Sequence, residues 1–249
     1  MKKKLFIAGC ARSGTSALAH LIGVNKDVVM GMERYGEFYK KDDFRIANNL
    51  FTKERFLDVR NGDTFYDDFA KFHRWDSNIE NKLINGSYRY IGDKRPEIYE
   101  VYDEIYSVFP DAKCIFIYRD LFEVAASWNK RAEAKENWPA TKDFKKAVFA
   151  WNNSLRLTLS ALERYPEKIA CVNYRDVFID NRNLGPLYNW LELEFDRETV
   201  EKYENILANS LRLQKERSEY SLSAEQRAFC ESNADFRFES MLDEKNILL

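Results

Sequence analysis

The chain has 249 residues, which is enough for one large α/β domain with a proper hydrophobic core. Its 39 basic and 41 acidic residues give a formal net charge of -2, which argues against a general nucleic-acid binder and against an acidic tail. The four cysteines lie far apart and there are only two histidines, so no zinc spacing occurs and a reducing compartment is indicated. No apolar stretch reaches membrane-spanning length, and the run LFIAGCA is too short for a signal peptide and is broken by Arg12. We therefore expect a cytoplasmic protein without a membrane span or a metal site.

Apolar runs alternate with helical patterns along most of the chain. Three short runs predict buried strands: KLFIAG (4–9), AKCIFIYR (112–119) and KIACVNYR (168–175). Three further patterns predict helices: TSALAHLIG (15–23), LFEVAASWNKRAEAK (121–135) and a long helix over 143–165 that is stopped by Pro166. Strands that alternate with helices predict an α/β fold with a parallel sheet, and we expect a single domain over 1–249.

The segment 38–90 departs from this alternation. Aromatic residues recur in it at helical spacing among mixed charges, with turn signals at RNGD and NGS. We interpret it as a helical insertion between early strands that caps the carboxyl edge of the sheet. A plain amphipathic layer over the sheet is the alternative, and the two roles are compatible. The residue pattern over 184–249 predicts helices and loops.

Residues 9–16, GCARSGTS, join the first predicted strand to the first predicted helix. A glycine-rich loop at this position presents backbone N–H groups and the positive end of a helix dipole to an anion. The Walker A pattern ends in Gly-Lys-Ser/Thr, whereas this loop ends in Gly14-Thr15-Ser16 and carries its charge on Arg12. The loop therefore predicts an anion site without the Walker lysine, with an ordinary strand-to-helix turn as the alternative.

The predicted strand 112–119 ends in Arg119, again at the carboxyl edge of the sheet. Ser127 and Arg131 follow on the next helix, four residues apart, and so share a helix face. Two guanidinium groups and a hydroxyl that converge there are suited to a phosphate monoester. By itself the pattern also fits a surface helix with solvated charges, but together with the loop 9–16 it predicts a second phosphate subsite.

These two motifs resemble those of sulfotransferases. GCARSGTSAL resembles the loop that binds the 5′-phosphosulfate, commonly P-R/K-S-G-T-T/S, and YRDLFEVAASWNKR resembles the 3′-phosphate motif R-D-P-x-x-x-x-x-S. IACVNYRDVF resembles the strand that follows in the family, so the similarity extends from about residue 4 to about residue 180. Ala11 and Leu121 stand where proline is usual, and both prolines shape turns rather than take part in chemistry.

The resemblance implies a P-loop-type α/β fold with 3′-phosphoadenosine 5′-phosphosulfate (PAPS) as donor, adenosine 3′,5′-bisphosphate (PAP) as product, and no metal. It implies that the 5′-phosphosulfate is held by Arg12, Ser13, Gly14, Thr15 and Ser16. It also implies that the 3′-phosphate and the nucleotide are held by Arg119, Ser127, Arg131 and Tyr174. The missing Walker lysine fits this donor, because a sulfuryl group carries less charge than a terminal phosphoryl group and its transfer needs oriented N–H groups and cations.

Transfer to a hydroxyl also needs a general base. Glu33 is the first candidate, because NKDVVMGMER resembles the segment of tyrosylprotein sulfotransferases in which a glutamate is the base, and bacterial and carbohydrate sulfotransferases tend to use glutamate there too. The alternative for Glu33 is a carboxylate that lies at a helix start. Glu37 is the second candidate and His73 stays open, whereas His20, inside the first helix, is expected to be structural.

YIGDKRPEIY (90–99) resembles the G-(D/E)-K-x-P stretch of bacterial, tyrosylprotein and heparan-type sulfotransferases. The resemblance implies that Lys94 pairs with the base or steadies the bridging oxygen as charge develops there. An exposed lysine before a proline-started helix is the alternative. We expect an in-line transfer in which Glu33 takes the acceptor proton while Arg12 and Lys94 stabilise the departing phosphate oxygen.

The acceptor is predicted only as a hydroxyl compound: a carbohydrate, a phenol or a peptide tyrosine. A carbohydrate is slightly favoured by the glutamate base and by the aromatic residues of 38–90 as stacking surfaces. Lys215 or Arg217 would be placed to fold over the donor, no nucleic-acid partner is expected, and the oligomeric state is not indicated. Two other functions share these motifs: a P-loop small-molecule kinase, which would need the Walker lysine and a magnesium ligand, and a non-catalytic nucleotide-binding module, which would need no base.

Overall fold

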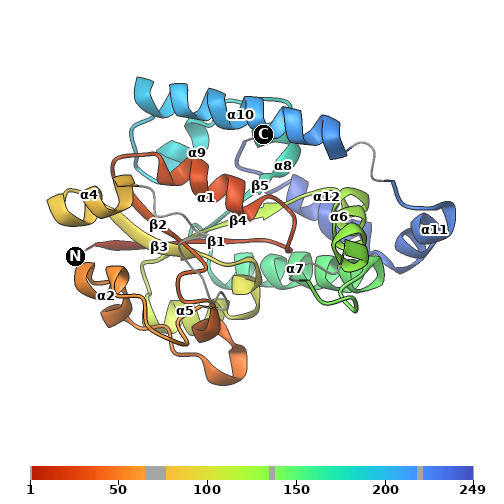
Figure 1. Cartoon of the computed structure of the whole chain (residues 1–249), viewed down its shortest axis with the longest axis horizontal. Helices are drawn as coiled ribbons and strands as arrows, with labels where there is room; N and C mark the ends of the chain where they lie inside the picture. Colours follow the sequence, from red (N-terminus) through yellow and green to blue (C-terminus); the bar gives the residue numbers. More distant parts are fainter. Residues whose placement is uncertain (1, 65–76, 135–137, 218–220, 249) are drawn as a thin grey trace.

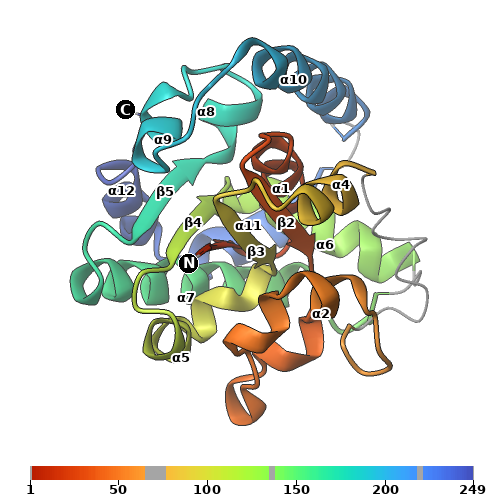
Figure 2. The same cartoon turned by 90° about the vertical axis from the view of Figure 1, so that its left-hand side faces the viewer.

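The computed structural model describes residues 2–64, 77–134, 138–217 and 221–248. Five parallel strands form a sheet in the order β2-β3-β1-β4-β5 (Figures 1 and 2). They are β1 (Lys3–Ala8), β2 (Val28–Met32), β3 (Tyr90–Lys94), β4 (Lys113–Tyr118) and β5 (Ile169–Asn173). The expected α/β fold with a parallel sheet is confirmed. Because all five strands run in the same direction, their carboxyl ends meet at one edge, where ligands of open α/β sheets bind.

Helices cover both faces of the sheet. One face carries α1 (Thr15–Gly23), α8 (Tyr174–Phe178), α9 (Gly185–Trp190) and α10 (Arg197–Arg217), and the other carries α5 (Tyr102–Val108) and α7 (Phe144–Arg164) (Figure 1). Three further helices pack against α7: α6 (Leu121–Ala134), α11 (Ala224–Asn233) and α12 (Phe236–Asp243). Alternate residues of β1 point to opposite faces, so Leu5 and Ile7 join the apolar cluster under α1 while Phe6 joins the cluster with Trp151 of α7.

Strands β1, β4 and β5 coincide with the predicted apolar runs to within two residues at each end. Strands β2 and β3 were not predicted, because each has five residues with a glycine inside, Gly31 or Gly92, and glycine weakens the strand signal. An added Cβ atom on Gly92 would lie 1.6 Å from the Leu5 carbonyl oxygen. Glycine at this position therefore lets β3 lie close against β1.

The segment between β2 and β3 contains most of the predicted insertion. Its described part forms short helices: η1 (Gly36–Tyr39), η2 (Lys41–Asp43), η3 (Asn48–Phe51), α2 (Lys53–Leu57) and α4 (Ser77–Asn85). Tyr39, Phe51 and Phe56 are buried in the apolar cluster on the α7 face. Phe51 packs edge-on against Phe6 of β1, with 5.9 Å between ring centroids. These aromatic residues build the core, and the role of the segment as a cap over the site stays a prediction.

The end of the chain returns to the sheet. After α12, the backbone N–H of Ile247 donates to the carbonyl of Cys171 in β5 at 3.0 Å, and a single bridge joins Cys171 to Asn246. This bridge extends the outer edge of β5 and fixes the last described turn of the chain against the sheet.

Candidate active site

The loop 9–16 connects β1 to α1 at the carboxyl edge of the sheet. Gly14 precedes α1 with a left-handed φ of 98°, and Arg12 has a φ of 76°, which costs a residue other than glycine ~1–2 kcal/mol. Ser13 is fully buried, and its Oγ has no hydrogen-bond partner within the described residues. A buried hydroxyl of this kind at a helix N-terminus fits a loop that binds an anion.

Tyr174, at the start of α8, forms one wall of the loop. An added Cβ atom on Gly14 would lie 2.5 Å from the Tyr174 ring, so the loop and the ring are in direct contact. The Arg119 guanidinium lies over the same ring, 4.0 Å from its centroid. Arg119 is buried at the end of β4, pairs with Glu123 of α6, and its carbonyl accepts a hydrogen bond from the Trp151 indole at 2.9 Å. The predicted 3′-phosphate arginine and the predicted nucleotide-pocket tyrosine are therefore in contact.

Arg12 joins the loop to α6. Its Nε donates to Ser127 Oγ at 3.1 Å, and Trp128 donates from its indole nitrogen to the Ala11 carbonyl at 2.8 Å. These contacts hold the loop against the helix that carries the predicted 3′-phosphate motif. Arg131, one turn further along α6, is exposed. The structure thus brings Ser127 to the loop and leaves Arg131 at the surface.

A cavity of about 530 Å³ runs along the loop and α1. Part of its wall comes from the loop, the ends of β4 and β5, and α10: Arg12, Gly14, Thr15, Ser16, Arg119, Tyr174, Ile206, Asn209 and Ser210. Strand β2 and helix α4 contribute Met30, Met32 and Ile79. Its volume is within the range of ligand pockets, about 300–1,000 Å³. The α10 residues were not predicted, because no motif marks them and their place in the wall depends on how α10 packs on α1 and α8.

Glu33 and Lys94 lie at the carboxyl ends of β2 and β3. Lys94 Nζ donates to Glu33 Oε1 at 2.6 Å, and the Glu33 backbone N–H donates to the Lys94 carbonyl at 2.7 Å. The Lys94 side chain is 1% exposed and that of Glu33 is 14% exposed, so the ion pair is shielded from solvent. Lys94 is therefore not an exposed lysine, and Glu33, with a φ of 58°, does not lie at a helix start.

Strand register places this ion pair beside the loop 9–16. Lys94 lies opposite Ile7 of β1 and Met32 of β2. The chain continues from Lys94 into η4 (Pro96–Glu100), and the Gly9 backbone N–H donates to the Pro96 carbonyl at 3.1 Å. The Glu33 carboxylate and the Lys94 ammonium group thus lie at the same sheet edge as the loop 9–16, next to its first residue.

The other candidate bases are placed differently. Glu37 pairs with Lys40, not with Lys94. His20 is exposed and lines the cavity, so it does not pack in the core as a structural residue would. His73 lies outside the described residues, as do the side chains of Lys215 and Arg217.

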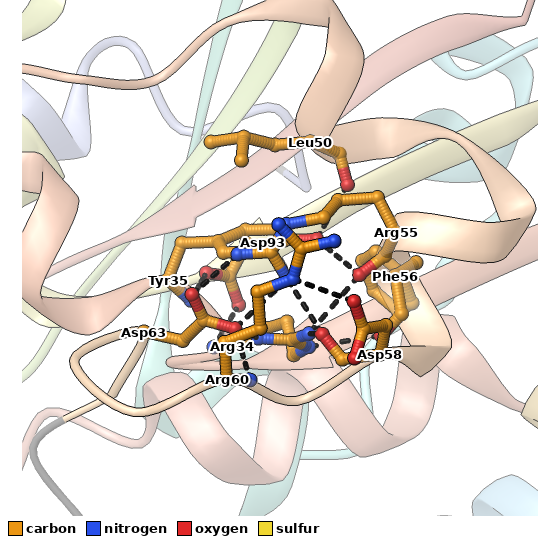
Figure 3. Close-up of polar contacts among 9 residues, drawn as sticks. All are labelled: Arg34, Tyr35, Leu50, Arg55, Phe56, Asp58, Arg60, Asp63 and Asp93. Carbon is orange, nitrogen blue, oxygen red and sulfur yellow. Dashed lines mark hydrogen bonds and ion pairs between the residues drawn. The ribbon is translucent and has the colours of Figure 1, made fainter.

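A buried polar network supports the turn after Glu33 (Figure 3). Asp93 accepts the backbone N–H groups of Arg34 and Tyr35 at 2.9 and 3.1 Å, and the Arg34 guanidinium donates to Asp63 at 2.8 Å. Burial raises the pKa of Asp93 to about 6, against the lowering effect of the two backbone hydrogen bonds. Neither Asp93 nor Arg34 was predicted. The sequence could have pointed to both residues only through their position, since each directly adjoins a candidate site residue.

The sequence matches the sulfotransferase family over residues 4–197. The chain belongs to the sulfotransferase family. Two solved structures are similar in fold: sulfotransferase STF9 from Mycobacterium avium (TM-score 0.53, 15% identity, 98% of this chain and 76% of that chain) and the sulfotransferase domain from the curacin biosynthetic pathway (TM-score 0.51, 17% identity, 80% of this chain and 77% of that chain). No curated protein matches the chain.

Family membership makes the chain a sulfuryl-transferring enzyme and implies a sulfate donor and a hydroxyl-bearing acceptor. In the described parts of this sulfotransferase, no three His, Cys, Asp or Glu side chains gather as a metal site. None of its described helices is long and apolar enough to cross a membrane.

Proposed function

We propose that this sulfotransferase moves the sulfuryl group of PAPS to the hydroxyl of an acceptor, with Glu33 as the general base. The observation that carries the proposal is the shielded Glu33–Lys94 ion pair next to the anion loop. A module that only binds a nucleotide would need no carboxylate at this position. A P-loop kinase would need a lysine directly after Gly14, where this chain has Thr15.

The loop and its neighbours suit the two anionic ends of PAPS. Backbone N–H groups of residues 13–16 and the Arg12 guanidinium bind the 5′-phosphosulfate, and the buried Ser13 Oγ supplies a further donor. Arg119 and Ser127 bind the 3′-phosphate, while the exposed Arg131 contributes at the rim. The cavity wall formed by Tyr174 and α10 receives the nucleoside.

The transfer step follows from the ion pair. Glu33 takes the proton of the acceptor hydroxyl, and the acceptor oxygen forms a bond to sulfur as the bond from sulfur to the 5′-phosphate oxygen breaks. When Glu33 becomes neutral, Lys94 loses its anionic partner and keeps its positive charge. Lys94 and Arg12 then stabilise the negative charge that develops on the departing phosphate oxygen, within a site largely shielded from water.

The acceptor is a hydroxyl compound, and the described residues favour none of the three acceptor classes over the others. The stacking argument for a carbohydrate relied on the aromatic residues of 38–90, and Tyr39, Phe51 and Phe56 are buried in the core. The activity assay therefore tests three acceptors side by side, a sugar, a phenol and a tyrosine peptide, with radiolabelled PAPS as donor.

Donor identity is tested by thermal unfolding with PAP or with Mg-ATP. A ligand at 100 times its Kd stabilises the folded state by about 2.7 kcal/mol, so we expect PAP to raise Tm by several degrees and ATP to leave it unchanged. A shift with Mg-ATP alone would favour the kinase.

The base is tested by Glu33→Gln, with Glu37→Gln as the matched control. We expect Glu33→Gln to lower kcat by about 10²–10⁴-fold and to keep the PAP-induced Tm shift, because the amide cannot take the proton. Glu37→Gln should transfer at the wild-type rate. A fully active Glu33→Gln enzyme would remove Glu33 from the mechanism.

A further inference from the structure

Two buried charged residues adjoin the Glu33–Lys94 ion pair in the sequence. Arg34 follows Glu33, and Asp93 precedes Lys94. Both side chains are 0% exposed. A buried charge is costly unless it is paired and hydrogen-bonded, so their contacts indicate what the fold uses them for.

Asp93 fixes the backbone that carries Glu33. One oxygen of its carboxylate accepts from Arg34 N at 2.9 Å and the other from Tyr35 N at 3.1 Å. These are the two amides directly after Glu33, whose own backbone is left-handed, with a φ of 58°. An added Cβ atom on Gly31 would lie only 2.7 Å from Asp93 Oδ1, so the carboxylate is closely enclosed by this turn. Asp93 therefore acts on the orientation of Glu33 through the backbone, without pairing with the Glu33 side chain.

Arg34 joins the same turn to the segment 55–63 of the insertion. Its Nε donates to the Phe56 carbonyl at 2.9 Å, and its Nη2 donates to the Asp58 carbonyl at 2.8 Å. Its Nη1 donates to Asp63 at 2.8 Å, and Asp63 also pairs with Arg55 (Figure 3). The end of β2 and this part of the insertion are thus one hydrogen-bonded unit.

We propose that Asp93 and Arg34 are positioning residues that hold the Glu33 carboxylate against Lys94 and join it to the segment 55–63. The proposal rests on the proposed function, since it assumes that Glu33 is the base. The hydrogen bonds of Asp93 go to the turn after Glu33, and those of Arg34 go to the insertion, so their removal should affect the transfer step and spare donor binding. If a residue only stabilised the fold, its removal would lower the transfer rate and the donor affinity together.

The test is Asp93→Asn, with Asp143→Asn as the matched control. Asp143 also accepts two consecutive backbone amides, Lys145 N at 3.0 Å and Lys146 N at 3.2 Å, but at the start of α7. With whichever of the three acceptors turns over fastest, we expect Asp93→Asn to lower kcat by ~10–100-fold, because a small misplacement of a reacting group has an effect of this size. Its Kd for PAP should stay within about twofold of wild type, and Asp143→Asn should change neither quantity by more than about twofold.

Asp63→Asn provides a second measurement if Asp93→Asn does not fold. It keeps the size of the side chain and weakens the contact with Arg34, so kcat should fall by about threefold or more at unchanged PAP affinity. The proposal is overturned if the folded variants keep wild-type kcat, or if kcat and PAP affinity fall together. Glu33→Gln is measured in parallel: if that variant is inactive while Asp93→Asn is fully active, the positioning role fails and the base assignment stands. If Glu33→Gln is active, the base assignment itself fails.

Discussion

Gly14 is the residue at which the anion loop, the start of α1 and the Tyr174 ring meet, and we expect Gly14→Ala to weaken both stability and donor binding. Its φ of 98° costs an alanine ~1–2 kcal/mol. The new methyl group would lie 2.5 and 2.8 Å from two ring carbons of Tyr174, well inside the carbon–carbon contact distance of about 3.5–4.0 Å. Overpacking of this kind adds ~1–3 kcal/mol, so the total is ~2–5 kcal/mol.

The ring cannot retreat without breaking other contacts. Tyr174 lies under the Arg119 guanidinium at 4.0 Å and packs on Phe178 at 5.1 Å between ring centroids. If Tyr174 moves, Arg119 loses its support. If the loop moves, its N–H groups lose their alignment. Either response should weaken PAP binding as well as the fold, which distinguishes this position from an ordinary strained glycine.

Gly86→Ala is the matched control, because Gly86 also has a positive φ, 66°, but an added Cβ atom there meets no atom within 4 Å. Urea unfolding should show a loss of ~1–2 kcal/mol for Gly86→Ala and a clearly larger loss for Gly14→Ala. Calorimetric titration with PAP should show weakened binding in Gly14→Ala alone. The packing argument is refuted if the two variants lose equal stability and both bind PAP as wild type does.

Two further predictions concern charged residues at the carboxyl edge of the sheet. Arg119→Ala should weaken PAP binding by ~10–100-fold in calorimetric titration, because it removes a charged hydrogen-bond partner of a phosphate; an unchanged Kd would place the 3′-phosphate elsewhere. Asp93→Asn should change how stability depends on pH. Burial raises the pKa of Asp93 from 3.8 to about 6, so the folded state keeps a proton that the unfolded state releases, and stability falls as pH rises between these values by ~3 kcal/mol. Urea unfolding from pH 4 to pH 7 should show the stability of wild type falling relative to that of the variant, whereas parallel pH profiles would contradict it.

The parts of the site that sequence predicted are those encoded by local pattern. The helix Thr15–Gly23 has the predicted bounds, because a strand, a glycine loop and an apolar helical face follow one another directly. The position of Ser127 on the helix that follows Arg119 was also predicted, although the contact of its hydroxyl with Arg12 was not. Both inferences need only the order of elements and the spacing of side chains.

The parts that were missed depend on contacts between distant segments. Asp93 bonds to a backbone amide 59 residues earlier in the chain, which no periodicity encodes. Strands β2 and β3 were overlooked because their internal glycines reduce the strand signal. Gly92 allows close approach to the β1 backbone, and Gly31 allows close approach of the Asp93 carboxylate. Asn209 and Ser210 enter the cavity wall only through the packing of α10 on α1.

Backbone strain gives an independent reason to regard Arg12 and Glu33 as functional. In the described chain, five residues other than glycine have a positive φ: Arg12, Glu33, Glu167, Asn181 and Glu192. The last three are exposed, whereas Arg12 and Glu33 are partly buried and their side chains contact Ser127 and Lys94 at 3.1 and 2.6 Å. A glycine at either position would relieve ~1–2 kcal/mol of strain and would also remove a guanidinium from the anion loop or a carboxylate from beside it. The left-handed backbone at these two positions is thus best explained by the side chains that it presents to one edge of the sheet.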